Sequence, residues 1–92
     1  MMSVIPTKLG LSKDVDNEIL RVGIIAELDA VNLYEQLAAT AKDPAIKERL
    51  LDIAKEEKVH MGEFQALLLK LDKEQVKGLE DGKGEVENAK KK

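Results

Sequence analysis

Two apolar seams, each with a period of 3.5 residues, constrain this sequence more than any other feature. The apolar positions alternate by three and four from Leu20 to Ala41, and again from Ile46 to Leu71. Such a period is typical of α-helices that pack side by side. Only two to four residues separate the two helices, which favours an antiparallel hairpin. The sequence therefore predicts an all-α protein built on a two-helix hairpin.

Capping residues indicate where these helices begin. We predict the first helix over about residues 14–41, and three residues can cap its start: Ser12, Asp14 and Asp16. We predict the second from Pro44 to about Lys70. Asp43 can cap this helix, and Pro44 suits its first turn, where the missing N–H does no harm.

A short third helix is predicted over residues 73–79, with Asp72 and Gln75 as its capping pair. The glycines at 82 and 84 and the lysine-rich end then suggest a flexible tail. We therefore predict one domain, residues 1–79, and a flexible tail, residues 80–92.

The composition limits what the chain can do. A core built by 92 residues is thin, and association with further copies is a common remedy. The net charge of -3 disfavours a nucleic-acid partner, and the absence of cysteine excludes disulfides and thiolate metal sites. Apolar runs are too short for a membrane span or a signal peptide, so we expect a cytoplasmic protein with no membrane partner.

Near its middle, each apolar seam is interrupted by a glutamate or histidine side chain. Glu27 interrupts the first, and Glu57 and His60 interrupt the second. In an antiparallel hairpin these three lie within about one helical turn of one level, and residues three apart share a face. One Glu opposite a Glu-x-x-His is half of a carboxylate-bridged di-iron site, so a two-fold dimer would complete a four-helix bundle and the site. The alternative is that they are ordinary polar residues on a helix edge.

Other polar residues and glycines near this level have plainer explanations. Glu56 and Glu63 fall off the seam, and we expect them to face solvent. Tyr34 lies two turns after Glu27, where it can either bind a ligand residue or belong to the core. Gly23 and Gly62 suggest close helix packing rather than chemistry.

Two blocks, "EILRVGIIAELDAVNLYEQLA" and "LLDIAKEEKVHMGEFQALLLKLD", resemble the encapsulated ferritins, ferritin-like proteins that work inside encapsulin nanocompartments. The first block also resembles the ferritin-like domain fused ahead of some archaeal encapsulin shells. The resemblance implies a hairpin with a short third helix and a di-iron ferroxidase site made only between two subunits. It assigns the site to Glu27 as terminal carboxylate, Glu57 as bridging carboxylate and His60 as imidazole ligand. Tyr34 matches a tyrosine near the site, and Asp29 fits an outer metal-uptake position.

The resemblance also carries expectations about partners and function. It implies a ring of dimers, usually a decamer, and an encapsulin shell as partner. Ala26 stands where another member has an acid, and the C-terminal stretch "EDGKGEVENAKKK" contains no shell-docking peptide, so metal uptake and shell loading can differ here. We expect a ferroxidase that oxidises Fe²⁺ to Fe³⁺ and supplies iron for storage inside a shell. The alternative is a helical dimerisation module in which metal is a folding staple without turnover.

Overall fold

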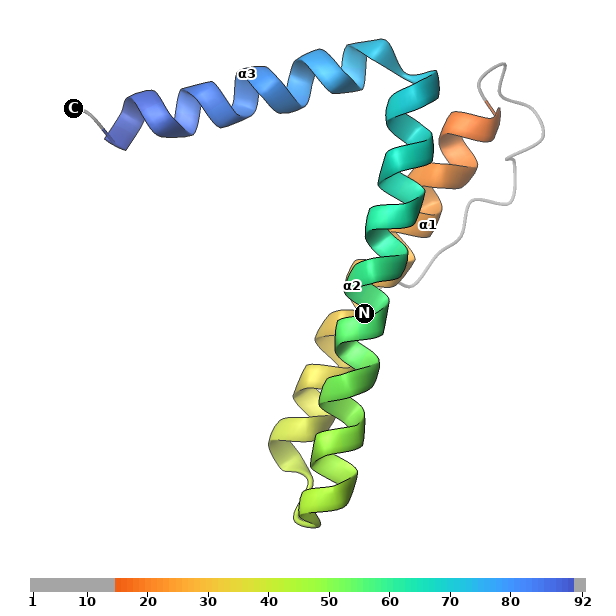
Figure 1. Cartoon of the computed structure of the whole chain (residues 1–92), viewed down its shortest axis with the longest axis vertical. Coiled ribbons are helices and arrows are strands. Elements are labelled where there is room, and N and C mark those ends of the chain that lie inside the picture. The colour runs from red at the N-terminus through yellow and green to blue at the C-terminus, as the bar shows by residue number, and fades with distance from the viewer. Residues whose placement is uncertain (1–14, 91–92) are drawn as a thin grey trace.

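The computed structural model describes residues 15–90 and contains three helices: α1 (Val15–Thr40), α2 (Pro44–Leu71) and α3 (Lys73–Lys90). α1 and α2 run antiparallel side by side, and α3 extends away from the end of the hairpin (Figure 1). The Cα radius of gyration is 16.6 Å, against about 12 Å for a compact chain of this length. The predicted all-α class and hairpin are confirmed.

The hairpin begins and ends close to the predicted positions. Asp43 caps α2, because its side chain accepts a hydrogen bond of 2.8 Å from the backbone N–H of Ala45, and Pro44 occupies the first turn. Asp16 is not a cap but lies in the first turn of α1, where a negative charge favours the helix dipole. The other two predicted caps, Ser12 and Asp14, lie outside the described residues.

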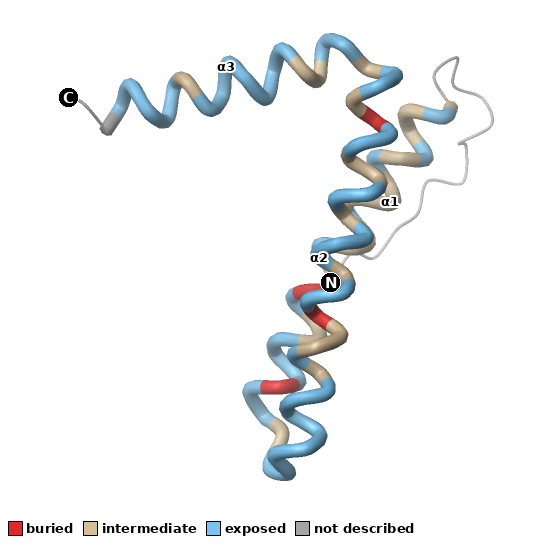
Figure 2. The backbone as a smooth tube through the Cα atoms, in the orientation of Figure 1, coloured by how far each residue is buried: buried red, intermediate tan, exposed pale blue. Residues whose placement is uncertain are grey.

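The hydrophobic core is thin and lies between α1 and α2. Within residues 15–89, four apolar residues are buried: Val31, Ala38, Ala54 and Leu68 (Figure 2). Val31 and Ala38 belong to the predicted seam of α1. On α2 the buried positions come one residue after the predicted seam positions Ile53 and Leu67, and Leu67 is 50% exposed. The predicted seam of α2 therefore faces α1 only in part: Phe64 is half-buried, whereas Leu67 lies beside the core.

Asp72 connects α2 to α3 and anchors the junction. Its backbone N–H donates to the Leu68 carbonyl at 2.8 Å, and its side chain accepts from the Gln75 N–H at 3.0 Å. Of the predicted capping pair, the bond from the Gln75 backbone N–H to the Asp72 side chain is thus present. The Arg21 guanidinium on α1 lies 2.9 Å from the Asp72 carboxylate and, with the hydrogen bond from Gln75, lowers its pKa. Three connections therefore converge on the residue between α2 and α3.

α3 continues well past its predicted end at Leu79. Residues 80–90 are helical, although they belong to the segment predicted to be a flexible tail. Ion pairs at i, i+4 support this part of the helix, with Lys77 Nζ 2.8 Å from Asp81 Oδ1 and Lys83 Nζ 3.9 Å from Glu87 Oε1. No helix within residues 15–90 has an apolar stretch that could cross a membrane.

Candidate metal centre

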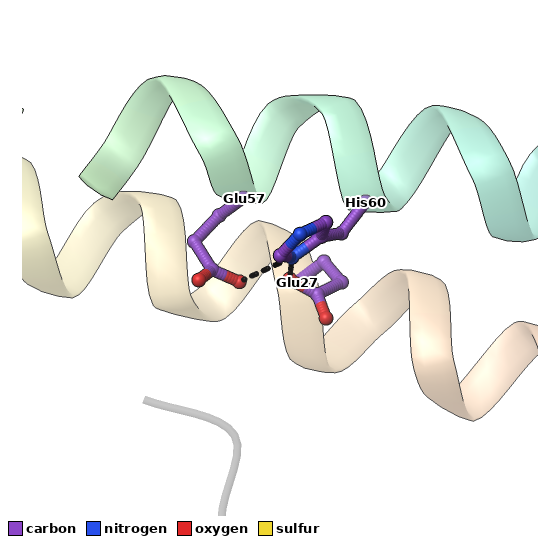
Figure 3. A group of neighbouring side chains, drawn as sticks. All are labelled: Glu27, Glu57 and His60. Atoms are coloured by element: carbon purple, nitrogen blue, oxygen red, sulfur yellow. Dashed lines mark ion pairs between the residues drawn. The ribbon is translucent and has the colours of Figure 1, made fainter. Parts of the chain in front are cut away.

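Three potential metal ligands meet near the middle of the hairpin. Glu27 extends from α1, and Glu57 and His60 extend from successive turns of α2 toward the same point (Figure 3). One potential ligand atom from each lies within 4.8 Å of the other two. Helical spacing aligns the two residues of α2, and the short connection between the helices brings them level with Glu27. The structure thus brings together the three residues that the sequence predicted to converge.

The distances within this group suit a shared cation better than direct hydrogen bonding. His60 Nδ1 lies 3.6 Å from Glu27 Oε2 and 3.6 Å from Glu57 Oε2. Both distances exceed the range of about 2.7–3.2 Å for a hydrogen bond between nitrogen and oxygen. Donor atoms that bind one ion at about 2.0–2.2 Å lie roughly 3–3.5 Å apart. The three side chains therefore need little rearrangement to hold an ion between them.

The group opens toward solvent on one side. The side chains of Glu27 and Glu57 are each 19% exposed, whereas that of His60 is 47% exposed. No polar or charged residue between 15 and 89 is fully buried. The carboxylates are therefore held in the hairpin while the imidazole lies at its surface.

The Glu27 Oε2 atom is inaccessible to solvent and has no hydrogen-bond partner among the described residues; Glu18 Oε2, on the same helix, is the other such side-chain atom among them. The Glu57 side chain raises the pKa of Glu27, because a protonated Glu27 can share a hydrogen bond with it; burial and the Glu57 charge add to this, and His60 opposes it. Two carboxylates and an imidazole fit iron, manganese or zinc, and a cation would satisfy the orphan oxygen.

A hollow of about 350 Å³ lies beside the group. It is lined by Glu27, His60, Glu63, Phe64 and Leu67. Glu63 is exposed, as the sequence predicts, but it also lines this hollow, which the sequence analysis does not predict. Its position three residues after His60 is the sequence signal for this, since residues three apart share a helix face.

Asp29 and Tyr34 are not members of the ligand group. Asp29 is half-buried on α1, two residues after Glu27. Tyr34 is half-buried on the same helix, and its hydroxyl makes no hydrogen bond to the ligand group within the described part of the chain. Their roles in metal uptake or in support of the ligands stay predictions.

A helical hairpin that opposes Glu to Glu-x-x-His is the half-unit of the ferritin-like carboxylate proteins. Fold and site together define this class. The chain matches the rubrerythrin family over residues 18–92, and it belongs to that family.

Comparison with known proteins confirms the resemblance to encapsulated ferritins. The chain is 52% identical over 90 residues to a ferritin-like–encapsulin shell fusion protein of Pyrococcus furiosus, an alignment that covers 94% of this chain. The chain spans about a quarter of that relative's length, 26%. It also resembles the crystal structure of the encapsulated ferritin domain from Pyrococcus furiosus, with a TM-score of 0.81 and 50% identity over 96% of this chain and 94% of that one.

Proposed function

We propose that the protein is a ferroxidase whose di-iron site is completed by a second copy of the chain. The observation that carries this proposal is the convergence of Glu27, Glu57 and His60 around a buried carboxylate oxygen that has no hydrogen-bond partner. A ferritin-like site uses four carboxylates and two imidazoles, and one chain supplies half of each. Four carboxylates balance the charge of two Fe²⁺ ions.

The open face of α2 supports the second copy. His60, Leu67 and Leu71 continue the row that the hairpin leaves uncovered, and they are 47%, 50% and 56% exposed. A second hairpin related by a two-fold axis near the ligands would bury this row and add the missing ligands. The resemblance to encapsulated ferritins extends the proposal to a ring of such dimers, with a decamer as the expected size.

Iron is the substrate in this proposal. Each of two Fe²⁺ ions bound by the paired ligand sets gives one electron to an external oxidant such as dioxygen, and Fe³⁺ is the product. Hard carboxylate oxygens from Glu27 and Glu57 favour Fe³⁺ over Fe²⁺ and so assist the oxidation. His60 holds the remaining position on each ion.

Mineral storage requires an enclosure that a hairpin does not provide. We propose that the Fe³⁺ product is deposited inside an encapsulin shell in the cytoplasm. The support is the Pyrococcus furiosus relative, whose name joins a ferritin-like part to an encapsulin shell in one chain.

Iron oxidation measured by stopped-flow absorption tests the proposal. Glu57→Ala and His60→Ala should each slow aerobic Fe²⁺ oxidation at least tenfold, because each removes a ligand from both half-sites. Glu56→Ala is the matched control, since Glu56 is exposed and adjacent to Glu57. Oxidation at the parent rate by both site variants in folded protein would overturn the proposal. Parent protein that binds iron without oxidising it faster than buffer would instead support a structural metal staple.

Native mass spectrometry tests the shared site separately. Two metal ions should bind per two chains, and removal of metal by chelator should shift the population toward smaller species, because four facing carboxylates then repel each other. A monomer that carries a complete two-metal site would show that no second copy is needed.

A further inference from the structure

Gly23 of α1 faces the ring of Phe64 of α2 across the hairpin, and the ring leaves little room for a side chain at position 23. A Cβ atom added at Gly23 would lie 3.2 Å from each of three carbon atoms of the Phe64 ring. Fewer than one in ten real Cβ contacts are so tight. Gly23 does not have a positive φ, so the backbone does not require glycine there. The approach of the ring is what requires it.

This contact lies one turn from the candidate metal centre. Gly23 precedes Glu27 by four residues, and Phe64 follows His60 by four. In an antiparallel pair of helices the two cross-helix pairs are therefore neighbours, about 6 Å apart along the axis. Phe64 also lines the same hollow as Glu27 and His60. The ring thus fills the gap between α1 and α2 directly beside the ligands.

We propose that Gly23 and Phe64 are positioning residues for the metal centre. Their contact sets the separation of α1 and α2 at the level of the ligands. The proposal rests on the proposed function only in that the ligand group binds metal. Neither residue touches the ion. They act through Glu27 and His60, which the two helices carry.

The size of the displacement makes this contact matter. An added methyl group at Gly23 would force the ring or the helices to move by a few tenths of an ångström. Metal–ligand distances in well-formed sites lie within about 0.2 Å of their standard values. The loss of supporting residues around a metal site typically weakens binding by about 10–100-fold. A methyl group at this position is therefore large enough to disturb the ligands without removing any of them.

Titration with Co²⁺ provides a test that does not depend on iron oxidation. The visible absorption of bound Co²⁺ reports the number and geometry of the ligands around the ion. Gly23→Ala should weaken Co²⁺ binding by about tenfold and change this spectrum. Gly62→Ala is the matched control, since a Cβ there would meet nothing within 4 Å and Gly62 lies only two residues after His60 in the chain. It should bind Co²⁺ as the parent does. Thermal unfolding in chelator confirms that each variant is folded.

A compensating substitution separates positioning from general damage. Leucine in place of Phe64 removes the ring atoms that the new methyl group would meet, so Gly23→Ala/Phe64→Leu should recover most of the parent affinity and spectrum. If Gly23→Ala does not fold, Phe64→Leu alone serves as the test, and it should also alter the Co²⁺ spectrum because the spacer is lost.

Several outcomes would overturn the positioning role. They are a parent-like affinity and spectrum in Gly23→Ala, an equal loss in Gly62→Ala, no recovery in the double variant, or a parent-like spectrum in Phe64→Leu. His60→Ala distinguishes these from failure of the metal centre itself. If His60→Ala loses Co²⁺ while Gly23→Ala does not, only the positioning role is wrong. If His60→Ala retains Co²⁺, the ion binds elsewhere and the metal centre is wrong.

Discussion

Replacement of Glu27 by glutamine should stabilise the metal-free protein and abolish its stabilisation by metal. In the metal-free chain, Glu27 holds a negative charge close to Glu57, and its Oε2 atom is buried without a hydrogen-bond partner. Glutamine has nearly the same shape, removes the charge and supplies an N–H group that can donate to Glu57. The same change removes a ligand from the ion.

The structure gives the expected size of both effects. A buried polar atom without a partner costs about 1–3 kcal/mol, so relief of this cost at Glu27 should stabilise the metal-free protein by about 1–2 kcal/mol. For a domain of this length, each kcal/mol raises the melting temperature by about 4–8 °C. A metal at a hundred times its dissociation constant stabilises the parent by about 2.7 kcal/mol, which Glu27→Gln should lack.

The assay is thermal unfolding followed by circular dichroism, once in chelator and once in excess Co²⁺, at one protein concentration. Glu56→Gln is the control, because it makes the same chemical change at an exposed position on α2. It should stay within about 0.5 kcal/mol of the parent in both conditions. If Glu27→Gln melts below the parent in chelator, the cost assigned to the buried Glu27 oxygen is refuted. If Co²⁺ stabilises it as much as the parent, the assignment of Glu27 as a metal ligand is refuted.

Three further predictions concern pH, metal uptake and the core. The metal-free protein should lose stability as pH rises from 4.5 through the raised pKa of Glu27. It should also lose stability as pH falls below 3.8 through the lowered pKa of Asp72. In urea unfolding at several pH values, Glu27→Gln should lack only the loss of stability with rising pH. Asp29→Ala should slow iron uptake without changing the number of ions bound, and an unchanged rate would leave Asp29 without an uptake role. Leu68→Ala, at a position 3% exposed, should cost about 2–5 kcal/mol in chemical unfolding, and a cost below about 1 kcal/mol would place the core elsewhere.

The hairpin and the level at which its three candidate ligands lie could be predicted because the rules behind them are local. The 3.5-residue period, the cap at Asp43 and the short connection fix two antiparallel helices and their register. Once the register is known, the helical rise places Glu27 level with Glu57 and His60. The spacing predicts this shared level, and the side-chain orientations in the structure then bring one potential ligand atom from each residue within 4.8 Å of the other two. The raised pKa of Glu27 could not be predicted in this way, because it depends on side-chain orientation and burial.

The predicted length of α3 is wrong because two local signals compete in the second half of this helix. Gly82 and Gly84 each disfavour a helix by about 1 kcal/mol relative to alanine, which favours a helix that ends before them. Ion pairs four residues apart, such as Lys77 with Asp81, act in the opposite direction. α3 makes few contacts with α2 that could stabilise it. Where α3 ends therefore depends on small differences in helix propensity, which sequence patterns predict least well.

The exposed face of α2 is the surface that the proposed second copy would cover. Two neighbouring rows on α2 are apolar: the row of Ala54 and Leu68, which packs against α1, and the row of Leu67 and Leu71, which remains exposed. A single hairpin has one partner helix for these two rows, so it can bury only one of them. The exposed row is the one that contains His60. Under the proposed function, association and metal binding are therefore coupled, because the surface that a second hairpin would cover is the surface on which each chain presents its share of the ligands.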